Sequence, residues 1–180
     1  MPPAVALAVV GLLSIQPPDT TFVGPGSPYL TRGLGGMGFG AGAALNVVTA
    51  ERISTTVDVG TFSLSGRQGG RLIPGAGGDV RLTQTVISGL LGQTNGTRTL
   101  HVQGGPALII GKAAYRGVSR TSDEAVRPGF TAAMDWINSP GVPVTLMLRY
   151  TFVPRSDEET LRGIGPHTLR VGVGIRLRLN

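Results

Sequence analysis

The amino-acid sequence predicts an all-β fold: a closed antiparallel up-and-down transmembrane β-barrel of eight strands, with a signal-like segment at its N-terminus. Three observations support this prediction. Apolar residues alternate with polar or small residues along seven segments, as in strands whose two faces meet different surroundings. The connections between these segments alternate between short turns and long polar loops. Finally, only 14% of the 180 residues are charged, whereas about a quarter is usual in a soluble domain.

An apolar run from Ala4 to Ile15 opens the chain. It is too short to cross a bilayer as a helix, which needs about 20 residues. Its composition is that of the apolar part of a secretory signal peptide. We therefore expect a signal peptide over residues 1–18 and a barrel domain over residues 19–180. The alternative is that the run itself supplies a strand of the barrel.

Seven segments show the two-residue period of a strand. The last is the most regular, with Leu169, Val171 and Val173 alternating with arginines and glycines. Bacterial barrels made of one chain have an even number of strands, so we expect an eighth strand before Met37, with Asp19–Val23 as the best candidate. The seven segments lie at 37–47, 53–60, 79–87, 100–110, 130–136, 144–152 and 169–179.

The expected connections are of two kinds. Turn-forming residues predict short turns at Thr49–Arg52, Gly92–Thr97 and Asn138–Pro143. Longer polar loops are expected at Ser65–Gly78, Lys112–Arg127 and Pro154–Pro166. Transmembrane barrels have this arrangement, with short periplasmic turns and longer outer loops.

The distribution of charge decides which face points outward. No charged residue falls on the apolar face of any segment. The opposite face carries all the charged residues of the strands and otherwise consists of Gly, Ala, Ser and Thr. Strands rich in glycine make a poor water-facing surface but suit a narrow lumen. The apolar face is then expected to contact lipid, through residues that include Trp136, Leu146, Leu148, Tyr150, Val171, Val173 and Ile175. The polar network in the lumen is expected to comprise Asp58, Asp79, Arg81, His101, Asp135, Arg149, Arg170 and Arg176.

This lumen network has two interpretations. Carboxylates and arginines on different strands can form a salt-bridged plug, or they can form an ion-selective constriction. Side chains just fill the interior of an eight-stranded barrel, and this favours the plug. A soluble lipocalin-type barrel, with apolar residues inside, is a further alternative.

Little in the sequence indicates catalysis or cofactor binding. The chain contains no cysteine and only two histidines, His101 and His167, and no motif ties a serine to either histidine. Gly33–Gly38 matches G-x-G-x-x-G but lacks the following helix of a dinucleotide site. Arginines neither cluster nor interleave with aromatic residues, which argues against nucleic acid as a partner despite the net charge of +6. We expect no enzyme activity, no metal and no cofactor.

Four stretches resemble the OmpA/OmpX-like family of small outer-membrane β-barrels. They are the glycine-alternating segment 36–42, the segments 101–108 and 129–136, and the closing segment 169–177. The resemblance implies a monomer in the bacterial outer membrane, inserted there by the barrel-assembly machinery and surrounded by membrane lipid. It also implies a non-enzymatic role as a scaffold, in adhesion or in envelope integrity. The alternatives are a narrow porin-like channel and a lipid A-modifying enzyme.

Overall fold

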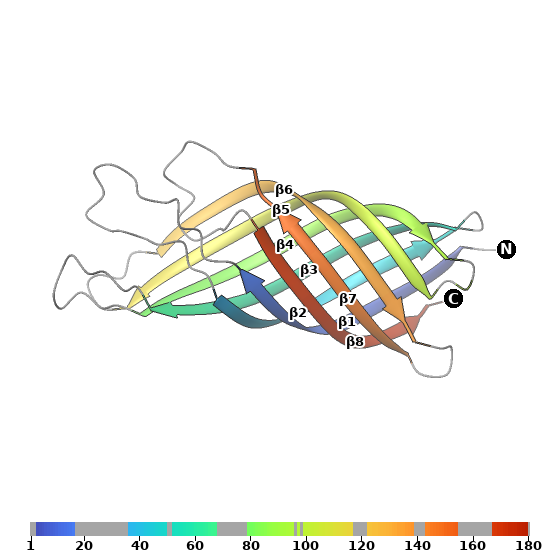
Figure 1. The fold of residues 1–180 in the computed structure, drawn as a ribbon, viewed down its shortest axis with the longest axis horizontal. Coiled ribbons are helices and arrows are strands. Elements are labelled where there is room, and N and C mark those ends of the chain that lie inside the picture. The colour runs from blue at the N-terminus through green and yellow to red at the C-terminus, as the bar shows by residue number, and fades with distance from the viewer. Residues whose placement is uncertain are drawn as a thin grey trace.

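The computed structural model describes residues 3–16, 36–49, 52–67, 79–95, 97, 99–116, 122–138, 143–154 and 167–179. Eight strands form one closed antiparallel barrel in which each strand pairs with its neighbours in sequence and β8 pairs with β1 (Figure 1). This confirms the predicted fold class and strand number. No helix in this part of the chain is long and apolar enough to cross a membrane. The strands are β1 (Ala4–Gln16), β2 (Gly36–Val48), β3 (Ile53–Arg67), β4 (Asp79–Thr94), β5 (Leu100–Arg116), β6 (Ser122–Ile137), β7 (Val144–Phe152) and β8 (His167–Arg178).

The N-terminal apolar run is the first strand. Ala4–Gln16 pairs with β2 along its whole length and with β8 from Ala6 to Ile15. The expected division into a leader and a barrel domain beginning at residue 19 therefore does not match the structure, because β1 closes the barrel. The alternative, that this run supplies a strand, is the one found. The other candidate, Asp19–Val23, lies outside the described residues.

The two ends of the barrel differ. Both chain termini lie at the end where β2–β3, β4–β5 and β6–β7 are joined by short turns, hereafter the short-turn end (Figure 1). At the opposite end, the loop end, the connections lie mostly outside the described residues. Phe152 on β7 pairs directly with His167 on β8. When its partners are traced the other way around the barrel, from β6 to β1, the trace reaches β8 at Leu177 instead, ten residues further along the strand. This stagger tilts the strands around a narrow interior.

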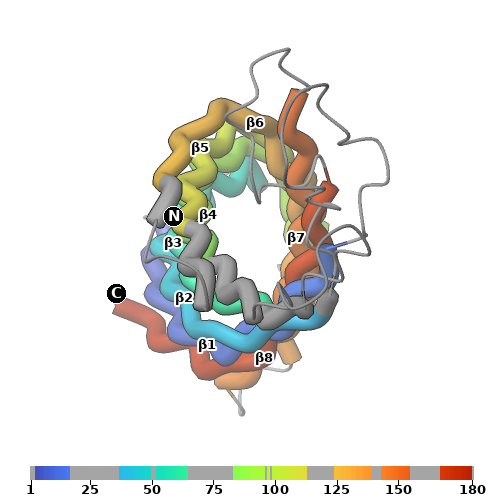
Figure 2. The backbone as a smooth tube through the Cα atoms, turned by 90° about the vertical axis from the view of Figure 1, so that its left-hand side faces the viewer, coloured from blue at the N-terminus to red at the C-terminus, as the bar shows by residue number. Residues whose placement is uncertain are grey.

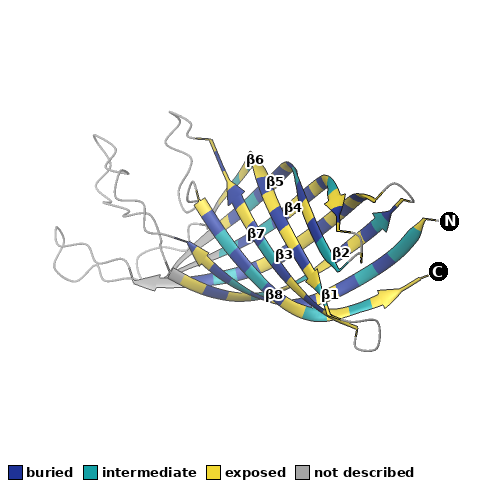
Figure 3. Ribbon diagram, turned by 45° about the vertical axis from the view of Figure 1, so that its right-hand side comes forward, coloured by how far each residue is buried: buried dark blue, intermediate teal, exposed yellow. Residues whose placement is uncertain are grey.

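Alternation of burial along the strands shows which residues face inward (Figure 3). In β2, β3 and β5–β8 the predicted apolar set faces outward and the predicted polar or small set faces inward. β1 follows the same rule, with Val9 and Ile15 exposed and Ser14 and Gln16 buried. The outward residues are mainly aliphatic and aromatic, as the sequence predicts.

The facing of β4 is the reverse of the prediction. With Asp79 and Arg81 expected inside, the two-residue period places Gln84 and Val86 outside. In the structure both are buried, whereas Thr85 and Ile87 point outward. The pairing with β3 continues through this region without a bulge. Asp79 and Arg81 belong to the set that was expected inside; their backbones lie in β4, and their side chains are outside the described part of the chain. β4 was misread because it is polar on its outer face and carries apolar residues on its inner face near the loop end.

Four strands, β3 to β6, are longer than the sequence indicates. β5 extends to Arg116 and β6 begins at Ser122, so most of the expected loop Lys112–Arg127 is paired strand, from Ile109↔Arg127 to Ala114↔Ser122. By contrast, β7 spans only nine residues and ends at Phe152. The β3–β6 sheet therefore extends further toward the loop end than β7 and β8 do (Figure 1).

Inward-facing glycines mark places where neighbouring strands approach closely. A Cβ atom added at Gly40 would lie 1.9 Å from the Thr61 carbonyl oxygen, and one added at Gly174 would lie 2.0 Å from that of Val9. Gly105, beside β4, is equally constrained by the Gly89 carbonyl at 2.0 Å. Viewed along its length, the barrel is oval rather than round (Figure 2). The glycines allow the sharp bending that a small closed sheet requires.

Candidate functional site

The barrel interior contains three successive layers of side chains. A polar layer lies at the short-turn end, a charged layer lies in the middle, and an apolar layer lies at the loop end. The polar layer consists of Asn46, Ser54, Thr56, His101, Gln103 and Arg176; the charged layer of Asp58, Asp135, Arg149 and Arg170; and the apolar layer of Phe62, Leu64, Val86, Ala107, Ile109 and Val153.

Hydrogen bonds in the polar layer have determined directions. Arg176 can only donate, so its Nη2 fixes the Asn46 side-chain oxygen as the acceptor, at 2.9 Å. The Asn46 amide then donates to Ser54 Oγ and to Thr56 Oγ1, each at 2.7 Å. Thr56 Oγ1 donates in turn to Gln103 Oε1 at 3.0 Å.

These directions set the form of the buried histidine. Ser54 Oγ accepts from Asn46 and, at 2.8 Å, from the Gln103 amide, which occupies both of its lone pairs. Its own proton must therefore point to His101 Nδ1, 3.2 Å away. His101 Nδ1 is thus an acceptor and carries no proton in this arrangement. Because Arg176 can only donate, it fixes the donor and acceptor of each of these hydrogen bonds in turn.

The charged layer joins opposite walls of the barrel. Arg149 on β7 makes a two-point contact with Asp135 on β6, with Nη2 3.0 Å from Asp135 Oδ2 and Nη1 bound to Oδ1. Its Nε lies 3.8 Å from Asp58 Oδ2 on β3, across the lumen. Arg170 on β8 approaches the same Asp58 oxygen at 3.6 Å. Two carboxylates thus balance two arginines that are each only 1% exposed.

Hydroxyl groups extend this layer along β4, β6 and β7. Ser88 donates to Thr131 at 3.2 Å, Thr131 and Thr151 share a hydrogen bond of 2.9 Å, and Arg170 Nη2 donates to Thr151 at 3.4 Å. Together with the Arg170–Asp58 ion pair, these contacts connect β3, β4, β6, β7 and β8 through the interior. Such a network holds the strands by side chains as well as by backbone pairing.

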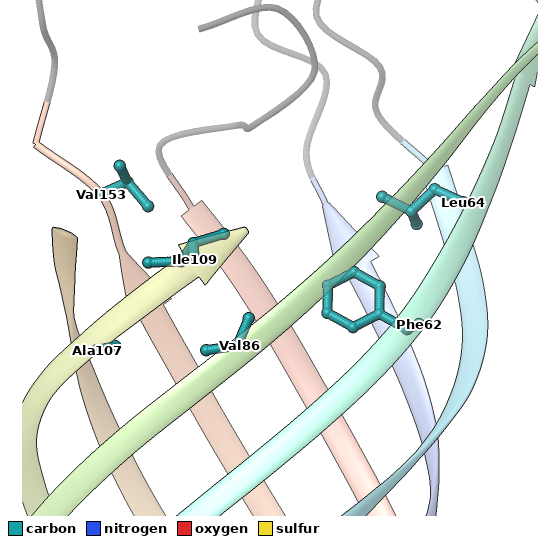
Figure 4. Close-up of a cluster of buried hydrophobic side chains, with 6 residues drawn as sticks. All are labelled: Phe62, Leu64, Val86, Ala107, Ile109 and Val153. Atoms are coloured by element: carbon teal, nitrogen blue, oxygen red, sulfur yellow. The ribbon is translucent and has the colours of Figure 1, made fainter. Parts of the chain in front are cut away.

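The apolar layer lines the loop end of the lumen (Figure 4). Phe62 and Val86 are each 1% exposed, although both belong to strands whose inner face was expected to be polar. Gln84 Nε2 donates to Gln16 Oε1 at 3.0 Å, which links β4 to β1. The apolar layer and this amide pair therefore lie between the charged layer and the loop end.

Glycines on the inner wall accommodate bulky neighbours. Cβ atoms added at Gly42 and Gly60 would lie 3.1 and 2.8 Å from Leu12 Cδ1, and one at Gly172 would lie 3.0 Å from Leu12 Cδ2. Leu12 thus occupies the space that three side chains would otherwise need. It packs with Ala8, Val10, Ala44 and Met147 in a second interior cluster. Apolar as well as charged side chains therefore point into the interior.

The predicted lumen residues fall into three groups. Asp58, Asp135, Arg149 and Arg170 come together in the charged layer, and His101 and Arg176 lie in the polar layer. The side chains of the other two predicted members, Asp79 and Arg81, lie outside the described residues. Asn46, Ser54, Thr56 and Gln103 lie on the predicted inward face but were not predicted as members of the network, and the apolar layer was not predicted. The signal that could have identified the four polar residues is their position on the inward-facing side of β2, β3 and β5, where every second residue points into the lumen.

The predicted lipid-facing residues lie on the outside of the barrel. Trp136, Tyr150, Val173 and Ile175 have exposed side chains, and Leu146 is also exposed; Leu148 and Val171 are half-buried by their neighbours. Near the loop end, Tyr150 Oη and His167 Nδ1 share a hydrogen bond of 2.6 Å. His167 also stacks on Tyr150 and lies against Phe152.

Ser54 and His101 have the residue types of a nucleophile and its base. However, they are 0% and 1% exposed, and both lone pairs of Ser54 Oγ accept hydrogen bonds from amides. In this arrangement the hydroxyl is buried and already engaged with the amides of Asn46 and Gln103. No group of three or more potential metal ligands occurs among the described residues. The polar side chains of the interior mostly form hydrogen bonds and ion pairs with one another.

Comparisons with known proteins identify the fold. No protein-family model and no curated protein matches the chain. Among solved structures, Ail, the attachment invasion locus protein of Yersinia pestis, in complex with the heparin analogue sucrose octasulfate, aligns with a TM-score of 0.62 at 10% identity over 98% of this chain and 100% of Ail. Another Ail structure aligns with a TM-score of 0.53 at 11% identity, covering 98% and 100% of the two chains. Neisserial surface protein A aligns with a TM-score of 0.52 at 12% identity, covering 98% and 97%. The chain therefore has the fold of the small eight-stranded β-barrels represented by these surface proteins.

Proposed function

We propose that the protein is a bacterial outer-membrane scaffold with a filled lumen, which presents the connections of its loop end to the exterior. The observation that carries this proposal is the distribution of side chains, which is the reverse of that in a soluble barrel. Exposed aliphatic and aromatic side chains cover the outside, while Asp58, Arg149 and Arg170 are buried inside. A closed barrel leaves no strand edge unpaired in hydrocarbon, as a membrane-spanning sheet requires.

Location and folding are tested together by fractionating cell envelopes and comparing the gel mobility of heated and unheated protein. The proposal expects the protein in the outer-membrane fraction, with faster migration before heating than after it, because a folded barrel resists the detergent. Recovery in the soluble fraction without detergent would instead support a lipocalin-type barrel and contradict the proposal.

A narrow channel is the main alternative, since the charged layer also has the composition of an ion-selective constriction. The packing of Leu12 over three glycines and the presence of the apolar layer at the loop end support a closed interior. In planar bilayers, the purified barrel is expected to produce no discrete conductance steps. Steps whose size changes in Arg170→Gln would establish a channel.

Binding at the loop end is the activity that a filled barrel can still supply. Arg71 and Arg120 lie in two of the connections at this end. The Ail structure contains sucrose octasulfate, which makes this compound a defined probe here. We expect calorimetric binding that weakens with salt and is reduced in the R71A/R120A variant. Hydrolysis of lipid A by the purified barrel would instead support the enzyme alternative.

A further inference from the structure

Hydroxyl side chains form a strip on the outer face of β3 and β4 near the loop end. Thr61 and Thr85 share a hydrogen bond of 3.0 Å, and Ser63 and Thr83 share one of 3.2 Å. The strip includes the region in which β4 faces opposite to the prediction. A polar outer surface is unusual in this barrel, so the strip needs a physical reason.

Lys112 continues the strip onto β5. It pairs in register with Thr83, points outward and is exposed. It is also the chain's sole lysine among 16 basic residues. On its other side, Lys112 pairs in register with Glu124 of β6. The strip therefore ends in an ammonium group that is flanked by hydroxyls on one side and by a carboxylate on the other.

Apolar side chains lie directly below the strip, toward the short-turn end. Val59, Ile87 and Leu108 occupy one row of the register across the same three strands, and all three are exposed. On β3 and β4 the outer surface thus changes from apolar to hydroxyl-bearing over about two residues, or about 7 Å. On β5 the change comes after Ile110, at Lys112. A molecule that covers both parts must be amphipathic, with its polar group toward the loop end.

The hydroxyl pairs retain unused hydrogen-bonding capacity. In each pair only one O–H is consumed by the mutual hydrogen bond, so one O–H and several lone pairs remain available. Placing such groups against hydrocarbon would cost about 1–3 kcal/mol each. Sugar hydroxyls can both donate to and accept from these groups, and a phosphate fits the ammonium of Lys112.

We propose that Thr61, Ser63, Thr83, Thr85 and Lys112 bind the headgroup of an outer-leaflet lipid that carries both sugar hydroxyls and phosphate. Its acyl chains lie along Val59, Ile87 and Leu108. The inference rests on the proposed membrane orientation, with the loop end outside. It adds to the scaffold role a specific lipid-binding site on one side of the barrel.

The test uses the folded barrel in phosphatidylcholine nanodiscs that contain one of three probe lipids. These are lipid A, which is a phosphorylated and acylated disaccharide; dephosphorylated lipid A, which lacks the phosphate; and phosphatidylglycerol, which lacks the sugar. Native mass spectrometry counts the probe molecules that remain bound after release of the barrel. We expect lipid A to bind best, and millimolar inorganic phosphate not to displace it.

Two variants separate the contributions of charge and hydroxyls. Lys112→Gln is expected to lower lipid A binding about tenfold, the effect of losing one hydrogen bond to a charged group, and to leave the dephosphorylated lipid unaffected. Thr83→Val/Thr85→Val should weaken both sugar lipids. The control is Thr55→Val, because Thr55 faces outward on β3 near the short-turn end. Its binding should equal that of the unaltered protein.

Equal binding of all three probes, or lipid A binding unchanged in both strip variants, would overturn the inference. Gel mobility without heating confirms that each variant is folded. The nanodisc measurement requires only a folded barrel, so its failure leaves the outer-membrane scaffold standing. Conversely, failure to find the protein in the outer membrane would refute the scaffold without changing the measured lipid preference.

Discussion

Arg149 links the charged layer to two carboxylates at once. It contacts Asp135 at two points and approaches Asp58 across the lumen. Removing one partner from a buried ion pair leaves an uncompensated charge, which costs about 3–5 kcal/mol. The free energy of unfolding should therefore fall by about this amount in Arg149→Ala.

Urea titration of the barrel in lipid vesicles measures this loss through the fluorescence of Trp136, the only tryptophan. Arg178→Ala is the control, since Arg178 is exposed at the rim and its removal should cost less than about 1 kcal/mol. A double D135N/R149M variant should regain part of the stability because no charge remains unpaired in that contact. Equal stability of Arg149→Ala and the unaltered protein would show that the charged layer is solvated.

Ser54 is the point at which the polar layer converges. Its hydroxyl accepts two amide N–H groups and donates to His101. In Ser54→Ala the amides of Asn46 and Gln103 lose an acceptor, and we expect a loss of about 1–3 kcal/mol. The same urea titration of Thr55→Ala, where the adjacent side chain points outward, should show a change below about 0.5 kcal/mol. Similar values for the two variants would contradict the proposed hydrogen-bond directions.

Among the strands, β2 depends most visibly on glycine. A methyl group at Gly40 would collide with the backbone of β3, with the Thr61 oxygen only 1.9 Å away. Gly89 on β4 provides a matched control, because nothing lies within 4 Å of an added Cβ atom. Gly40→Ala should lower stability by about 1–3 kcal/mol or more, whereas Gly89→Ala should be neutral or stabilising. Comparable losses in both variants would show that the bend between β2 and β3 tolerates side chains.

The alternation of residues was sufficient to predict most strands and their facing. It succeeded in β8, where apolar residues alternate strictly with Arg170, Gly172 and Arg176, because lipid and lumen impose opposite requirements. It failed in β4, where Thr83 and Thr85 are outside and Val86 is inside. In that strand, the outer face lies beside polar surroundings and the inner face lies in the apolar layer. The period remained two, but the usual assignment of the faces no longer applied.

The interior could be predicted only in part. Charged residues such as Asp58 and Arg170 are recognisable because a charge has few places in a membrane-spanning strand. Their partners depend on which strands face each other across the lumen, and this follows from the register and the ten-residue stagger. Local sequence contains no information about that stagger. The same dependence on closure explains why β1 was interpreted as a leader.

At the level of the whole molecule, the barrel requires β1. Removing residues 1–16 would leave β2 and β8 with unpaired edges, since both pair with this strand. Open edges are not tolerated in hydrocarbon. The truncated chain is therefore expected to lose heat-modifiable gel mobility. An insertion after Gly75, in the connection between β3 and β4, should preserve it. Normal mobility of the truncated chain would indicate that another segment replaces β1.

The orientation of the barrel is testable through Lys112. This lysine is exposed on the outer face of β5, close to the point where that strand ends at the loop end. A membrane-impermeant amine reagent applied to intact cells should modify Lys112, with Lys112→Arg as the unreactive control. Modification only after the envelope is broken would place the loop end in the periplasm.

The layered interior makes the two openings of the barrel chemically unequal. A water molecule at the short-turn end meets Arg176, Asn46 and His101, which can exchange hydrogen bonds with it. At the loop end it meets mainly Phe62 and Leu64, which offer none, beside the Gln16–Gln84 pair, whose amides bind each other. Deuterium should therefore penetrate from the short-turn end, replacing the protons around Ser54 first and those around Arg170 later. If the proposed orientation holds, the interior exchanges protons with the periplasm faster than with the outside of the cell.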